Sequence, residues 1–192
     1  SRIIDDLAEF GWSLQTQFAP TSLTHQLAEE CRQRIAQGTL APAGTGRGHA
    51  VAVREGTRSD HIQWLEAGQS PACDGYLQLL DELREAINQS LYLGLVDYES
   101  HFAFYPPGGF YLKHLDRFRD DDRRAVSAVL YLNDGWQPED GGMLRLYLAD
   151  GQVRDVLPEA GTLVVFLSAD IPHEVLPASR DRLSLTGWFR RR

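Results

Sequence analysis

The chain has 192 residues, of which 43% are hydrophobic and 24% are charged, as in an ordinary soluble globular protein of one domain. Its net charge of −8 argues against a nucleic-acid-binding protein, which would carry a basic stripe. No apolar run is long enough to span a membrane, no signal peptide is visible, and the 2 cysteines are too few for a disulfide framework. We therefore expect a cytoplasmic, monomeric protein with one domain over residues 1–192.

Helical periodicity dominates the first half of the chain. A short apolar element and an edge strand at Trp12 are expected within residues 3–14. The next apolar residues recur every fourth position from Leu23 to Ile35, which predicts a supporting helix with Thr21 or Ser22 as its cap and Gly38 as its stop. A second supporting helix is expected from Asp74 to about Gly94, with leucines on one face.

The segment between these helices is rich in glycine and arginine. Residues 39–60 predict a loop or hairpin rather than a supporting element, and residues 60–66 follow as a short strand. Loops carry binding residues more often than scaffolds do, so Arg47, Arg54 and Arg58 are candidates for binding a substrate. The alternative is that these arginines only keep the loop soluble.

Short strands and turns fill the rest of the chain. Alternating apolar residues, separated by Asp-Gly and Gly-Gly turns, predict eight strands. They cover Tyr98–Tyr105, Tyr111–Asp116, Ala125–Leu132, Met143–Leu148, Gln152–Val156, Thr162–Leu167, His173–Leu176 and Leu183–Phe189. This spacing favours an α+β, mainly β fold, a jelly roll (double-stranded β-helix) over about 96–190 with N-terminal helices from about 1–95 packed on one sheet.

One stretch of this β region carries metal-binding chemistry. His114 and Asp116 are two positions apart on a predicted strand, so both side chains would point to the same face. His173 is the only later histidine, and it follows another predicted strand. Two imidazoles and one carboxylate form the facial triad of non-haem Fe(II) oxygenases, which predicts an iron site.

Arg182 supplies a second part of this site. It begins a predicted strand on which Ser184, Thr186 and Trp188 share its face. A guanidinium fixed on the pocket face can bind a carboxylate through two parallel hydrogen bonds. The iron chemistry would therefore use a dicarboxylate co-substrate.

Simpler interpretations of the same residues exist. A single His-x-Asp is common by chance, His173 alone would suit a hydrogen-bonded core histidine, and Arg182 alone would suit a surface charge. The combination favours the metal site. The remaining histidines have no carboxylate partner at ligand spacing, and we interpret them as non-ligands: His25, His49, His61 and His101.

Several motifs resemble the prolyl hydroxylase branch of the Fe(II)/2-oxoglutarate dioxygenases, especially the hypoxia-sensing prolyl hydroxylases of animals and their bacterial relatives. The resemblance covers roughly 35–189. The matching motifs are Tyr105-Pro-x-Gly-Gly-Phe-Tyr-x-x-His114-x-Asp116, Tyr131-Leu-Asn-x-x-Trp136, Gly141-Gly-x-Leu144-Arg, Pro172-His173-Glu-Val-x-Pro177, Arg182 through Thr186 to Trp188, and Arg58-x-Asp60-x-Ile62-x-Trp64-Leu-Glu66.

The resemblance implies a role for each matching position. His114, Asp116 and His173 would bind Fe(II), and Arg182 would pair with the distal carboxylate of 2-oxoglutarate. Tyr131 would donate its hydroxyl to the same carboxylate, and Tyr105 would lie near the iron. Leu144, Thr186 and Trp188 would line the pocket. The loop over residues 41–58 would fold over a bound substrate.

The resemblance also implies a reaction. The chain would hydroxylate a prolyl residue in a protein, as a peptidyl-prolyl 4-hydroxylase does, consuming O2 and 2-oxoglutarate and releasing succinate and carbon dioxide. Ascorbate would serve as a reductant, and elongation factor Tu is a candidate substrate because bacterial members of this branch target it. Two alternatives stay open, namely hydroxylation of another residue or a small molecule, and an inactive jelly-roll binding module.

Overall fold

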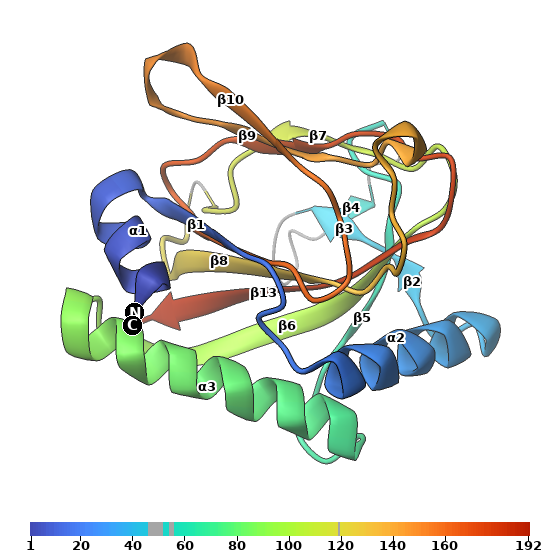
Figure 1. Ribbon diagram of the computed structural model, residues 1–192, viewed down its shortest axis with the longest axis horizontal. Helices are drawn as coiled ribbons and strands as arrows, with labels where there is room; N and C mark the ends of the chain where they lie inside the picture. The colour runs from blue at the N-terminus through green and yellow to red at the C-terminus, as the bar shows by residue number, and fades with distance from the viewer. Residues whose placement is uncertain (46–51, 54–55, 119) are drawn as a thin grey trace.

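The computed structural model describes residues 1–45, 52–53, 56–118 and 120–192. Two antiparallel sheets lie over one another, and the helices cover the outer side of the larger sheet (Figure 1). This arrangement confirms the expected mainly β jelly-roll architecture with N-terminal helices on one sheet. Within the described segments, we find no helix that combines the length and the apolar character needed to cross a membrane.

The larger sheet has seven strands and the smaller sheet has four. In spatial order, the larger sheet contains β1 (Trp12–Gln15), β11 (Leu163–Leu167), β8 (Arg124–Tyr131), β13 (Arg182–Arg191), β6 (Leu95–Tyr105), β5 (His61–Trp64) and β2 (Ala41–Pro42). The smaller sheet contains β10 (Val153–Val156), β9 (Leu144–Tyr147), β12 (His173–Val175) and β7 (Tyr111–His114). A short antiparallel pair, β3 (Gly44–Thr45) with β4 (Ala52–Val53), lies in the segment predicted to be a loop or hairpin.

The three α-helices are α1 (Arg2–Phe10), α2 (Thr21–Ala36) and α3 (Pro71–Leu91). The predicted start of α3 at Asp74 is wrong, because Ser70 caps the helix by accepting the Cys73 backbone N–H, with Pro71 at the first helical position. The predicted cap of α2 is also wrong, since Pro20 occupies that position without a side-chain cap.

Strand alternation creates two separate cores. On β8, Ala128 and Leu130 point toward the helices, whereas Val129 and Tyr131 point into the space between the sheets. The helix-side core therefore stabilises the larger sheet from outside. Because the helix-side core already holds the backbone of the larger sheet, side chains between the sheets can form a site.

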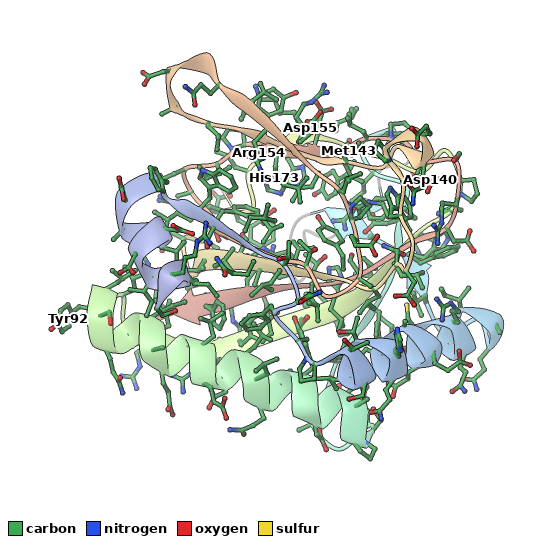
Figure 2. All side chains as sticks on the ribbon, in the orientation of Figure 1. Tyr92, Asp140, Met143, Arg154, Asp155 and His173 are labelled. Atoms are coloured by element: carbon green, nitrogen blue, oxygen red, sulfur yellow. The ribbon has the colours of Figure 1, made fainter. Side chains whose placement is uncertain are left out.

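The outer face of the smaller sheet is polar. Arg145 on β9 and Asp155 on β10 are direct cross-strand partners and form an ion pair at 2.8 Å. Figure 2 shows Asp155 and Arg154 on the surface of this hairpin and His173 in the interior. Only the inner face of the smaller sheet is therefore available for a buried site.

Candidate active site

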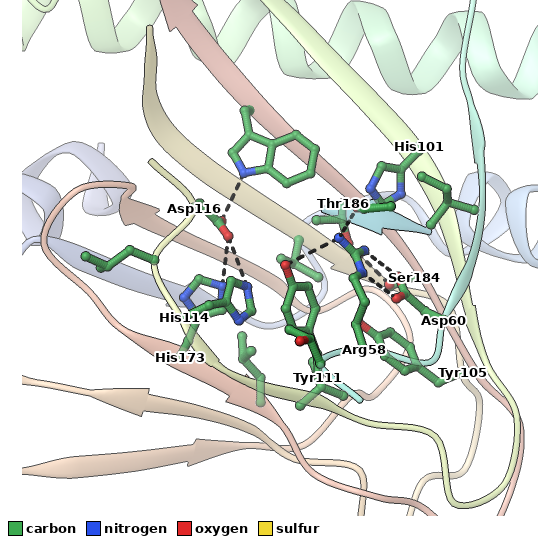
Figure 3. A pocket seen from close by; sticks show the side chains of 18 of the residues that line it. Arg58, Asp60, His101, Tyr105, Tyr111, His114, Asp116, His173, Ser184 and Thr186 are labelled. Carbon is green, nitrogen blue, oxygen red and sulfur yellow. Dashed lines mark hydrogen bonds and ion pairs between the residues drawn. The ribbon is translucent and has the colours of Figure 1, made fainter. Parts of the chain in front are cut away.

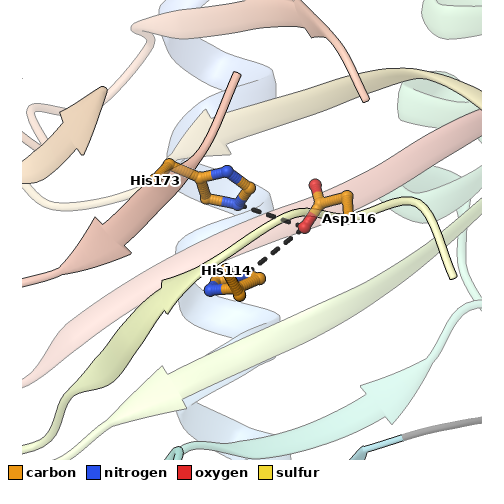
Figure 4. Close-up of side chains that lie close together, drawn as sticks. All are labelled: His114, Asp116 and His173. Carbon is orange, nitrogen blue, oxygen red and sulfur yellow. Dashed lines mark ion pairs between the residues drawn. The ribbon is translucent and has the colours of Figure 1, made fainter. Parts of the chain in front are cut away.

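Strand pairing brings the two candidate histidine ligands together. His114 on β7 and His173 on β12 are register partners in the smaller sheet. Their Nε2 atoms lie 3.3 Å and 3.1 Å from Oδ1 of Asp116 (Figure 4). Among the residues that the structure describes, this is the one group of three or more His, Cys, Asp or Glu side chains that could hold a metal ion.

The backbone fixes the tautomer of both imidazoles. Nδ1 of His114 lies 2.7 Å from the carbonyl oxygen of Leu112, and Nδ1 of His173 lies 3.0 Å from that of Ile171. A carbonyl can only accept a hydrogen bond, so both Nδ1 atoms carry the proton. Both Nε2 lone pairs are then left to bind a cation, as in metal-binding histidines.

Asp116 lies beside His114, but not through the strand alternation that the sequence predicted. Strand β7 ends at His114, so Asp116 is not on the predicted strand but in the segment after it. Two hydrogen bonds to Oδ2 hold its side chain, one from Ser127 Oγ at 2.7 Å and one from Trp188 Nε1 at 2.9 Å. Figure 3 shows the second of these, from the indole to Asp116. Tertiary contacts, rather than strand alternation, orient this carboxylate.

The electrostatics of the triad favour an ionised carboxylate. Burial opposes the charge of Asp116, but interactions with His173 and His114 outweigh burial and hold its pKa well below the usual value. Burial lowers the pKa of His114, whereas Asp116 overcomes burial and raises the pKa of His173. One carboxylate and two lone-pair nitrogens are a donor set that fits Fe(II).

Arg182 lies buried in the wall of the same cavity. Its side chain is only 2% exposed, and no carboxylate in the described part of the chain forms an ion pair with it. Nε donates to the carbonyl of Gly142 at 2.7 Å, and Nη2 donates to the hydroxyl of Tyr131 at 3.4 Å. A buried guanidinium is costly unless it is paired, so this site fits a carboxylate co-substrate.

The tyrosines beside Arg182 are suited to donate hydrogen bonds. The guanidinium carbon lies 5.2 Å from the ring centroid of Tyr105 and 5.1 Å from that of Tyr131. Burial raises the pKa of both tyrosines, although Arg182 opposes the effect. Both hydroxyls therefore stay protonated near neutral pH.

The predicted pocket residues meet around one cavity of about 300 Å³ (Figure 3). The metal triad and Arg182 line it, together with Tyr105, Tyr131, Leu144, Thr186, Trp188 and Arg58. Exposed apolar side chains, Trp64 and Leu115, lie at its edge. The cavity thus joins a polar interior to an apolar opening.

Arg58 is more constrained than a free surface arginine would be. Its Nε and Nη2 atoms donate to the two carboxylate oxygens of buried Asp60 at 2.8 Å and 2.7 Å. Its guanidinium also lies over the ring of Tyr111, at 4.2 Å from the centroid. Arg47 and Arg54, the other two arginines predicted to bind substrate, lie outside the described residues.

Four contributors to the site were not predicted from the sequence. Ser127 orients Asp116, Gly142 accepts from Arg182, Asp60 holds Arg58, and the ring of Tyr111 stacks on His114 with centroids 3.5 Å apart. Tyr111, Asp60 and Gly142 lie within the motifs that resemble the family, but the sequence did not assign these contacts to them. Ser127 lies in none of the motifs, and its contact with Asp116 joins two separate segments of the chain.

The comparisons with known proteins agree with this geometry. Residues 100–190 match the model of the 2OG-Fe(II) oxygenase superfamily. The hypoxia-inducible factor prolyl hydroxylase of Caenorhabditis elegans is 29% identical over 97% of this chain, which spans only 27% of that longer relative.

Solved structures give a similar result over nearly the whole chain. A prolyl-4-hydroxylase from Pseudomonas putida is 63% identical, with a TM-score of 0.92 over 99% of this chain and 97% of that one. A prolyl hydroxylase from Trichoplax adhaerens, solved with a peptide fragment of a hypoxia-inducible factor, is 26% identical, with a TM-score of 0.82 over 98% and 87% of the two chains. The chain therefore belongs to the prolyl hydroxylase family of the 2OG-Fe(II) oxygenase superfamily.

Proposed function

We propose that this protein is a dioxygenase that hydroxylates a prolyl residue in a protein substrate, with 2-oxoglutarate and O2 as co-substrates. The observation that carries the proposal is the placement of His114, Asp116 and His173 in one cavity with Arg182, which has no acidic partner among the described residues. The first three provide a metal-binding donor set, and Arg182 provides a site for a carboxylate. Succinate and carbon dioxide would be the other products.

Each side chain has a separate task in this reaction. His114, Asp116 and His173 would hold Fe(II), which supplies the coupling between oxidative decarboxylation of 2-oxoglutarate and hydroxylation of a C–H bond. Arg182 would bind the distal carboxylate of 2-oxoglutarate, and the hydroxyl of Tyr131 would donate to the same group. A co-substrate held in this way has little rotational freedom, which favours a productive orientation.

The remaining pocket residues would shape the substrate site. Trp188 lines the cavity while its indole N–H is bonded to Asp116, so its ring would pack against a substrate proline close to the metal. Tyr105, Leu144 and Thr186 would exclude water around the co-substrate. Arg58 would stiffen the base of the 41–58 loop through Asp60.

A protein substrate is supported by the Trichoplax neighbour, which was solved with a peptide of a hypoxia-inducible factor. We propose elongation factor Tu as the first substrate to test, on the basis of the resemblance to bacterial members of the branch. The loop arginines, Arg47 and Arg54 with Arg58, and Trp188 are the proposed contacts to it. We also propose a monomer in the cytoplasm, with ascorbate as a reductant; the two buried free cysteines suit a reducing compartment.

Mass spectrometry of prolyl peptides tests the proposed reaction. Purified elongation factor Tu and a cytosolic extract would be incubated with the protein, Fe(II), 2-oxoglutarate and air. We expect one added oxygen atom on a single proline, with 4-hydroxyproline recovered after hydrolysis. Asp116→Ala should abolish the product, whereas Asp155→Ala, which removes an exposed carboxylate on the outer face of the smaller sheet, should not.

The outcomes distinguish the alternatives. Oxygen added to an extract protein other than elongation factor Tu would change the substrate but keep the reaction. Succinate release without any oxidised protein would favour a small-molecule substrate. Absence of both would leave the chain as a binding module and overturn the proposed function.

A further inference from the structure

Two buried serines lie behind the metal-binding carboxylate. Ser127 is on β8, and Ser168 directly follows β11, the neighbouring strand in the larger sheet. Both are 0% exposed, and neither lines the cavity. Their Oγ atoms are 2.9 Å apart, and Ser127 Oγ is 2.7 Å from Oδ2 of Asp116.

The direction of these hydrogen bonds follows from the number of protons. A serine hydroxyl has one proton, and Ser127 donates its proton to the ionised Asp116. In the hydrogen bond between the two serines, Ser168 must therefore be the donor and Ser127 the acceptor. Ser168, Ser127 and Trp188 thus form a relay, in which Ser168 orients Ser127, and Ser127 and Trp188 both donate to Oδ2.

The relay leaves the two oxygens of Asp116 in different situations. Oδ2 already accepts two hydrogen bonds, at 2.7 Å and 2.9 Å, which is the capacity of its in-plane lone pairs. Within the described part of the chain, Oδ1 accepts from no serine or indole, and it lies 3.1 Å and 3.3 Å from the Nε2 atoms of His173 and His114. Only Oδ1 is therefore available to a cation between the histidines.

We propose that Ser127 and Ser168 are positioning residues that make Asp116 bind the metal through one oxygen, and so keep one coordination position open for dioxygen. The inference rests on the metal centre of the proposed function, but not on the identity of the substrate. Without the relay, the carboxylate could turn and bind through both oxygens. The added oxygen ligand would occupy a position that the co-substrates need.

Nitric oxide is a suitable probe, because it takes the position of dioxygen and needs no turnover. The protein would be loaded anaerobically with Fe(II) and 2-oxoglutarate and titrated with nitric oxide, followed by the electron paramagnetic resonance signal of the nitrosyl complex. We expect Ser127→Ala to weaken nitric oxide binding by about 10- to 100-fold, the size of effect that loss of an outer hydrogen-bond partner of a metal ligand has on metal affinity or activity. The amount of bound iron, measured in parallel, should not fall.

Ser168→Ala separates positioning from simple loss of a packed hydroxyl. It should weaken nitric oxide binding less than Ser127→Ala does, and the double variant should match Ser127→Ala because Ser168 acts only through Ser127. Ser127→Thr, which restores a hydroxyl donor, should recover binding. If Ser127→Ala does not fold, the milder Ser168→Ala still tests the relay through the same titration.

Ser13→Ala is a matched control on β1. Ser13 is 1% exposed and donates to Oδ2 of Asp6 at 2.7 Å, so its substitution removes a similar bond elsewhere in the protein. This variant should bind nitric oxide like the wild type.

Three results would overturn the proposal. They are unchanged nitric oxide binding in Ser127→Ala, loss of the iron itself in that variant, or a wild type that binds iron and 2-oxoglutarate but no nitric oxide. A wild type that behaves as expected here, yet hydroxylates no proline, would overturn the proposed substrate and leave the relay intact.

Discussion

Arg182 provides the most direct test at the level of single residues. It is buried beside Tyr131 and Gly142 and has no acidic partner among the described residues. Losing one member of a buried ion pair costs about 3–5 kcal/mol, so Arg182→Ala should weaken 2-oxoglutarate binding by more than about a hundredfold. Metal binding should be retained, since Arg182 is not a ligand. Calorimetric titration of 2-oxoglutarate into Mn(II)-loaded protein measures co-substrate binding, and titration of Mn(II) into metal-free protein measures metal binding.

The control for this prediction is Arg145→Ala. Arg145 also holds a carboxylate, that of Asp155, but on the exposed face of the smaller sheet, where such pairs contribute little. Its substitution should leave 2-oxoglutarate binding unchanged. Wild-type saturation in Arg182→Ala would show that Arg182 does not bind the co-substrate.

His101 gives a prediction about pH. It is 2% exposed and lies between Trp64 and Trp188, and burial lowers its pKa to about 4, although nearby Asp60 opposes the shift and Arg58 and Arg124 add to it. In the unfolded chain a histidine binds its proton near pH 6.5, whereas the folded protein does not until about pH 4. Stability should therefore fall as pH falls through this window, by about 2 kcal/mol at pH 4.5 for this group alone.

The variant His101→Leu should remove that part of the pH dependence. Urea unfolding at pH 7 and at about pH 4.5 gives the free energy of unfolding of both proteins. The loss between the two pH values should be smaller in the variant by about 2 kcal/mol. Equal losses in the two proteins would mean that His101 is protonated as readily in the folded state as in the unfolded state.

The residue types explain which parts of the site could be predicted. His114, Asp116, His173 and Arg182 carry distinctive chemistry, so their spacing was enough to indicate a metal and a carboxylate site. Ser127 and Ser168 are common residues separated by 41 positions, and only strand pairing brings them together. Hydrogen-bond partners of this kind are not visible in a single sequence.

At the scale of the elements, alternation predicted the strands better than their ends. The strand predicted from Leu183 to Phe189 is β13, which extends to Arg182–Arg191 because it pairs with β6 and β8 along its length. The strand predicted to reach Asp116 ends at His114, because β12 offers no partner beyond it. Strand ends depend on the neighbouring strands, and the sequence does not say which strands become neighbours.

Gly187 tests the close packing of β13 against β6. A Cβ atom at this position would lie 2.6 Å from the carbonyl oxygen of Glu99 and still closer to the hydroxyl of Tyr98. That hydroxyl is hydrogen-bonded to Tyr76 on α3, so it cannot move without disturbing the helix contact. Gly187→Ala should lower the free energy of unfolding by about 1–3 kcal/mol, measured by urea unfolding.

Gly75→Ala is the opposite control. Gly75 is on α3, where an added Cβ would make only an ordinary contact, 3.6 Å from Leu23 Cδ1. Alanine in a helix is favoured over glycine by about 0.5–1 kcal/mol, so this variant should be more stable than the wild type. If the two variants changed stability in the same direction, crowding would not explain the effect at Gly187.

At the scale of the whole molecule, the site joins elements that only the complete fold brings together. His114 and His173 come from the smaller sheet, and Arg182 and Trp188 from the larger one. The helix-side core supports the larger sheet from behind, so the cavity is built on backbone that does not depend on the ligands. An unfolded chain has no such arrangement, and the ligands should bind the folded state alone.

Ligand binding should therefore raise the melting temperature in two separable steps. A ligand present at about 100 times its Kd adds about 2.7 kcal/mol, which corresponds to about 5–10 °C for a chain of this size. We expect such a shift with Mn(II) and a further shift when 2-oxoglutarate is added, measured by differential scanning fluorimetry. His114→Ala should lose the shift with metal, whereas Arg182→Ala should keep it and lose only the second. A full melting-temperature shift with 2-oxoglutarate in Arg182→Ala would mean that the co-substrate binds at another place. Among the described residues, no other arginine that lines the cavity is buried without an acidic partner.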